Sequence, residues 1–166
     1  MGVEAFGVSM RLIKPGVFDH VIETLTSYDN VRMDRANTVA GFETATGEYN
    51  DGTHLIDLQI LRDLAENKCT LAVRFSLCSY ETIDHIFVNL VGKILSLFEG
   101  DVWLMTSALK QKANYLPGDE RWLIAALPDE ISAMRQYWQN LFGDKQGAVR
   151  VKDSFTFVGV GKKLIS

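Results

Sequence analysis

The stretch LAVRFSLCSYETIDHIFVNLVGKILSLF, residues 71–98, decides the fold, because its apolar period changes once along its length. In residues 71–77, apolar side chains alternate with small or polar ones, which is typical of a half-buried strand. In residues 83–98 they recur every three or four positions, which predicts an amphipathic helix. Gly100 is a suitable residue for the end of that helix. The stretch therefore predicts one strand followed by one helix.

A similar unit stands at the start of the chain. Residues 4–12 alternate as a strand, and from Val17 to Leu25 the apolar positions follow a helical period. The two units match in pattern rather than in residue identity. They divide the single domain expected for residues 1–166 into two structural halves, residues 1–66 and 67–166.

The rest of the chain predicts further strands and one more helix. A polar turn at residues 47–52 predicts an antiparallel hairpin, and Asp129 is a suitable N-cap for the last helix. The expected strands are residues 38–46, 53–62, 101–107, 120–127 and 148–160, and the expected third helix covers residues 131–142.

The expected order is therefore β-α-β-β, then β-α-β-β, then α-β. Strands that are adjacent in sequence usually pair, which predicts an α+β fold with one largely antiparallel sheet. The alternation within the strands predicts helices on one face only, with the other face partly exposed to water.

Composition excludes several classes of function. The 166 residues carry a net charge of −4 with both signs interspersed, which argues against a nucleic-acid-binding face. Charged and polar residues interrupt the apolar stretch at 83–98, which argues against a membrane span. The N-terminus has no signal-peptide pattern, and Cys69 and Cys78 are too far apart along a strand to form a disulfide. We therefore expect a cytoplasmic protein with reduced thiols.

The predicted hairpin carries the best cluster of titratable residues. If these side chains converge, they could perform acid–base chemistry or hold a divalent cation. They are the weak catalytic candidates Glu43, Glu48, His54 and Asp57. Polar residues also collect at hairpin tips simply because water is there. The sequence has no motif with metal-ligand spacing and no nucleotide-binding glycine pattern, so we expect no metal and no cofactor.

Aromatic residues and a polar loop near the second predicted strand pair form a candidate binding surface. Tryptophan and tyrosine dominate the energetics of protein interfaces, although the same residues also fill cores. The candidate binding residues are Trp103, Tyr115, Leu116, Asp119, Glu120 and Trp122.

The central part of the chain resembles a known family. The strand Val73-Arg74-Phe75-Ser76-Leu77, the helix after Tyr80-Glu81, and the segment Gly100-Asp101-Val102-Trp103-Leu104-Met105 are similar to the centre of small bacterial polymorphic-toxin immunity proteins. The resemblance covers residues 73–105. It implies a non-enzymatic cytosolic protein that binds and blocks a cognate toxin. Thr106-Ser107-Ala108 stands where the family has a polar Asn-Gly-Glu, so the resemblance assigns no binding residue here.

We therefore expect a protein-interaction module, immunity-like in the sense of this resemblance, that binds through the helix-free sheet face and the loop around Tyr115. Its mildly acidic charge would suit a basic partner. One alternative is a small enzyme or ligand-binding domain that uses the hairpin cluster. A second alternative is a structural homodimer that pairs its own sheet edge with a copy of itself.

Overall fold

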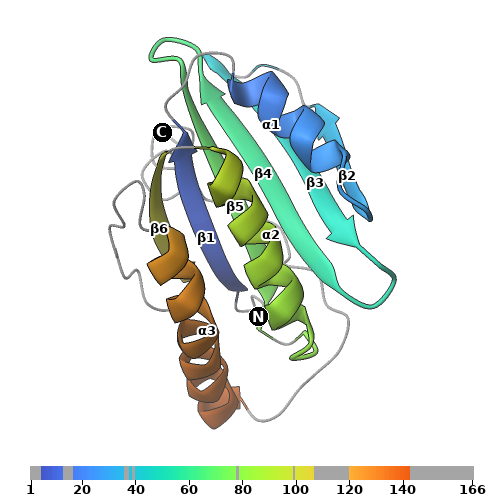
Figure 1. The fold of residues 1–166 in the computed structure, drawn as a ribbon, viewed down its shortest axis with the longest axis vertical. Coiled ribbons are helices and arrows are strands. Elements are labelled where there is room, and N and C mark those ends of the chain that lie inside the picture. Colours follow the sequence, from blue (N-terminus) through green and yellow to red (C-terminus); the bar gives the residue numbers. More distant parts are fainter. Residues whose placement is uncertain are drawn as a thin grey trace.

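Six strands form one antiparallel sheet in the order β2-β3-β4-β5-β1-β6, with helices packed on one face (Figure 1). The structure, a computed structural model, describes residues 5–12, 17–35, 38, 40–77, 79–98, 100–106 and 120–142. The elements in chain order are β1 (Ala5–Leu12), α1 (Val17–Thr26), β2 (Val31–Arg35), β3 (Phe42–Asn50), β4 (Leu55–Asp63), β5 (Lys68–Ser76), α2 (Ile83–Leu97), β6 (Gly100–Thr106) and α3 (Glu120–Phe142). The predicted α+β class and antiparallel sheet are confirmed.

The core lies between the sheet and the helices. The two strands with matching apolar stripes, β1 and β5, lie side by side at the centre of the sheet, and their helix-facing side chains are buried. These side chains are Phe6, Val8, Met10 and Leu12 on β1 and Cys69, Leu71, Val73 and Phe75 on β5. Helix α2 packs across them, and the ring of Phe87 lies 4.8 Å from that of Phe75. All three helices contribute to the same hydrophobic cluster.

The strand predicted at residues 120–127 is wrong, because this segment begins α3. A short apolar run does not distinguish a strand from a buried helix segment. The buried positions Leu127, Ile131, Met134 and Trp138 follow a helical period across the exposed Pro128. Asp129 is therefore inside the helix and not its N-cap. The strand predicted at residues 148–160 lies outside the described residues.

The predicted hairpin is confirmed, but its turn lies further along the chain, at residues 51–54. Gly47, which was expected in the turn, is inside β3 opposite Met33. The turn forms where Gly52 adopts a φ of 90° and Asp51 Oδ1 accepts the backbone N–H groups of Thr53 and His54. Strand β2 is not predicted from the sequence.

A buried arginine fastens α3 to the rest of the molecule. Arg135 is 5% exposed, and its guanidinium donates to the carbonyl oxygens of Leu77 and Ser79 at 2.7 and 2.8 Å. It also forms a two-pronged ion pair with Asp84 and lies over the ring of Phe75. Burial raises the pKa of Asp84 above its ordinary value, and the guanidinium opposes that rise. These five residues, the Arg135 clamp, join α3 to the segment between β5 and α2.

Candidate functional site

The four titratable residues of the hairpin do not converge. Glu43 faces the helices and pairs with Arg62 on the neighbouring strand. Glu48 and Asp57 are cross-strand neighbours on the opposite sheet face, which we call the outer face. Successive strand residues point to alternate faces, and Glu48 follows Glu43 by an odd number of positions. The two side chains therefore lie on opposite faces of the sheet. His54 lies in the turn. The structure therefore brings together only Glu48 and Asp57.

His54 makes a different set of contacts, to residues that the sequence did not single out. Its Nδ1 lies 2.8 Å from Asp51 Oδ2, and its Nε2 lies 2.6 Å from Thr82 Oγ1, just before α2. Burial alone would raise the pKa of Asp51, but hydrogen bonds from the His54 side chain, from two backbone N–H groups and from Tyr49 hold it well below its usual range. A carboxylate, an imidazole and a hydroxyl thus stand in a row.

This row has the order of groups found in some hydrolases, in which an imidazole activates a hydroxyl. Such a reaction also needs N–H donors aimed at the developing oxyanion. At the start of α2, the N–H groups of Ile83 and Asp84 donate to the carbonyl oxygens of Tyr80 and Glu81. Those donors are therefore engaged within the chain. The arrangement acts as a tether between the β3–β4 turn and the beginning of α2.

Three of the six candidate binding residues lie in described elements. Trp103 lies in β6, opposite Ser9 of β1. Glu120 is the first residue of α3 and Trp122 lies within that helix, so the two tryptophans do not share a strand pair as expected. Tyr115, Leu116 and Asp119 lie outside the described residues.

The centre of the outer face is buried, so this face is exposed to water only in part. Ser9 of β1 and Ala72 of β5 are each 1% exposed although they point away from the helices. Burial also lowers the pKa of the Arg74 guanidinium, which lies on this face with Asp57 on the adjacent strand. Exposed side chains on the outer face are Arg32 and Asp34 at β2, and also Arg11 of β1 and Lys68 of β5. At β2 the exposed side chains lie next to the edge of the sheet.

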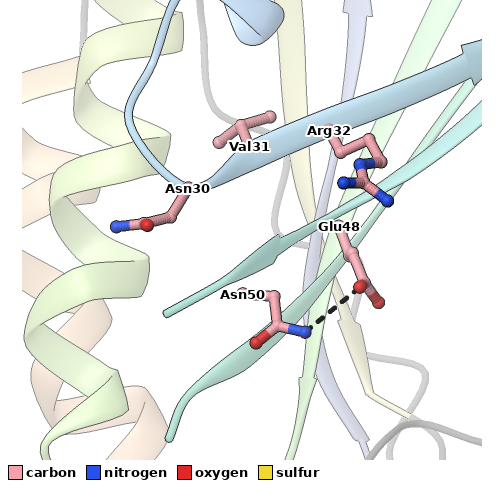
Figure 2. Close-up of a pocket in the computed structure, with 5 residues that line it drawn as sticks. All are labelled: Asn30, Val31, Arg32, Glu48 and Asn50. Atoms are coloured by element: carbon pink, nitrogen blue, oxygen red, sulfur yellow. Dashed lines mark hydrogen bonds between the residues drawn. The ribbon is translucent and has the colours of Figure 1, made fainter. Parts of the chain in front are cut away.

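A polar pocket of about 270 Å³ opens at this end, beside the start of β2 and the end of β3 (Figure 2). It is lined by Asn30, Val31, Arg32, Glu48 and Asn50. Asn50 Nδ2 donates to Glu48 Oε1 at 3.2 Å, and the backbone N–H of Asn50 donates to the Asn30 carbonyl oxygen at 2.9 Å. Figure 2 shows the guanidinium of Arg32 on the same side of the strands as Glu48 and Asn50. The pocket thus offers a cation, a carboxylate and amide groups to a polar ligand.

Beside the pocket, β2 ends the sheet, and no described strand pairs with its far side, which we call the outward edge. The bond from Asn50 to Asn30 fixes which backbone groups point outward, because hydrogen-bonded pairs alternate along an antiparallel ladder. Arg32 and Asp34 direct their backbone groups towards β3. The N–H and C=O of Met33 and the C=O of Val31 point outward, while the Val31 N–H donates to Tyr28 in the preceding turn.

Comparison with protein-family models finds no family that matches the chain, and comparison with curated proteins finds no significant match. No helix in the described ranges is long and apolar enough to span a membrane. Within the same part of the chain, no three His, Cys, Asp or Glu side chains gather as a metal site. Within the described residues, the pocket and the outward edge of β2 lie next to each other.

Proposed function

We propose that this chain is a non-enzymatic protein-interaction module that binds an extended polypeptide segment as an additional strand beside β2. The observation that carries the proposal is the outward edge, where the backbone groups of Met33 are directed away from the sheet. Strand addition is a common mode of peptide recognition, in which main-chain hydrogen bonds supply affinity and adjacent pockets supply specificity.

The polar pocket provides the second requirement of strand addition, an adjacent pocket that supplies specificity. Val31 and Arg32 belong both to the pocket lining and to β2, so a segment lying along β2 would pass directly beside the pocket. A side chain of that segment could then contact the Arg32 guanidinium or the Glu48 carboxylate. The resemblance of residues 73–105 to immunity proteins is consistent with a protein partner, and it names a bacterial toxin as the class of partner to test.

Random linear peptides displayed on phage test the mechanism without a known partner. Peptides selected on the wild-type chain should bind Met33→Ala nearly as well, because that variant keeps the outward N–H. They should bind Met33→Pro at least about tenfold more weakly, because proline removes this donor and its ring occupies the edge. Both variants lose the methionine side chain, so their difference reports on the backbone edge. Equal binding to both variants would reject strand addition at β2.

A further inference from the structure

We infer that the segment added beside β2 is the same strand of a second copy, so that the chain forms a homodimer with one continuous sheet. This inference rests on the proposed strand addition and names the partner. It follows from two independent features of β2, the direction of its backbone groups and the order of its charges.

The backbone directions allow a two-fold axis at Met33. In an antiparallel pair of identical strands, a residue on the axis faces its own copy. Because the N–H and C=O of Met33 both point outward, Met33 of each copy can donate to and accept from Met33 of the other. The carbonyl oxygen of Val31 then faces the backbone N–H of Arg35 in the second copy. The edge is therefore complementary to itself in hydrogen bonding.

The charges select the same register. With the axis at Met33, Arg32 of one copy lies directly opposite Asp34 of the other, and the second pair follows by symmetry. Both residues are exposed and lie on the outer face. An axis at Arg32 would place two arginines opposite one another, and an axis at Asp34 would place two aspartates opposite one another. Opposite charges across strands are stabilising and like charges are not. Hydrogen bonding and charge thus favour one register.

The apolar side of β2 fits this arrangement as well. Val31 and Met33 face the helices, and both are only half-buried against the core. In the dimer the two Met33 side chains meet at the axis and become further covered. Each pocket then lies at the dimer interface, since Val31 and Arg32 contribute to both the pocket and that interface. The second copy would therefore add a wall to each pocket.

Sedimentation equilibrium of the full chain tests the dimer. A five-residue strand gives a small interface, and weak, transient interfaces lie at the small end of the size range. Dissociation should therefore be measured up to about 1 mM, where a Kd in the millimolar range still gives detectable dimer. Arg32→Asp and Asp34→Arg, each alone, turn both opposite-charge contacts into like-charge contacts. Each should weaken dimerisation by about tenfold.

An equimolar mixture of the two variants provides the decisive measurement. Both cross-strand pairs of positions 32 and 34 then again join opposite charges. A heterodimer should therefore form about as tightly as the wild-type dimer. Because the mixture contains the same chains that associate poorly alone, recovery cannot come from a change in folding. A mixture that stays as monomeric as its components overturns the proposed register.

The result also separates this inference from the proposed function. A wild-type chain that remains monomeric at about 1 mM overturns the homodimer. If Met33→Pro nevertheless abolishes the binding of selected peptides, strand addition stands and the partner is a different polypeptide. If the chain dimerises and Met33→Pro dimerises equally well, the dimer contact lies elsewhere and the homodimer at β2 is overturned, whereas strand addition is decided by the peptide-binding test alone.

Discussion

The two ends of the molecule place an arginine in opposite environments. At the α3 end, Arg135 is buried, and its guanidinium is surrounded by two carbonyl oxygens and a carboxylate of its own chain. At the β2 end, Arg32 is exposed beside a pocket and next to the outward edge. A buried charge must be matched within the fold, so the loss of either partner destabilises the protein. An exposed charge at a strand edge can be matched by another molecule, so it can serve binding.

The largest effect is expected from breaking the Arg135 clamp. Arg135→Met leaves Asp84 without its cation and leaves the carbonyl oxygens of Leu77 and Ser79 without this donor. We expect a loss of about 3–5 kcal/mol in the free energy of unfolding, measured by urea denaturation. Gln136→Met, at the exposed neighbouring position, should change it by less than about 0.5 kcal/mol. A loss below about 1 kcal/mol for Arg135→Met would mean that water already satisfies these groups.

The contrast between the two ends also explains what the sequence could predict. The central strands and α2 follow from apolar periodicity. The helix-facing side chains of β1 and β5 alternate along the sequence with small or polar ones, and they are buried as expected. Strand β2 has the same alternation in Val31 and Met33, but only over five residues directly after a turn. So short a pattern is indistinguishable from a loop without its pairing partner β3.

The candidate site could be predicted only in part. The sequence indicates Glu48 as a titratable candidate. Arg32 lies opposite Glu48 because β2 pairs with β3, and the sequence does not predict that pairing. Asp51 contacts His54 from three positions away, but Thr82 contacts it from 28 positions away, so no local motif joins all three residues. The face on which a strand residue lies depends on where the hairpin turn falls. Moving the expected turn from residues 47–52 to residues 51–54 therefore changes which side chains are opposite one another.

Substitution of glycine by alanine should change the free energy of unfolding in opposite directions at Gly47 in β3 and at Gly92 in α2. A Cβ at Gly47 in β3 would collide with the Arg32 carbonyl oxygen and with the Met33 side chain. Gly47→Ala should therefore cost about 1–3 kcal/mol through overpacking. A Cβ at Gly92 in α2 would meet Ile124 of α3 at 3.4 Å, which is ordinary contact. Gly92→Ala should stabilise by about 0.5–1 kcal/mol, because alanine favours a helix.

Thermal or urea unfolding of both glycine variants checks this pair. If Gly47→Ala is neutral, the side chain of Met33 can move off β3, and β2 is less firmly held than its register indicates. If Gly92→Ala destabilises, the contact between α2 and α3 at Ile124 is too tight to accept a methyl group. Either result would contradict the expected difference between tight packing of β2 on β3 at Gly47 and ordinary contact between α2 and α3 at Gly92.

The smallest effect is expected at the turn that joins the two ends. Asp51 follows Asn50 of the pocket, and through His54 it connects to Thr82, which lies between Ser79 and Asp84 of the Arg135 clamp. The pKa of Asp51 is lowered in the folded chain from its ordinary value of 3.8. The ionised carboxylate therefore adds stability that is fully present above this value and is lost as the pH falls through the lower folded-state pKa.

Asp51→Asn keeps an oxygen that accepts the backbone N–H groups of Thr53 and His54 but removes the charge. The variant should be less stable than the wild type near neutral pH, and the difference in free energy of unfolding should shrink as the pH falls below 3.8. Thr53→Val, a neighbouring change without a titratable group, should differ from the wild type by the same amount at every pH. A difference for Asp51→Asn that does not change with acid would show that the charge contributes nothing, and that the tether depends on geometry alone.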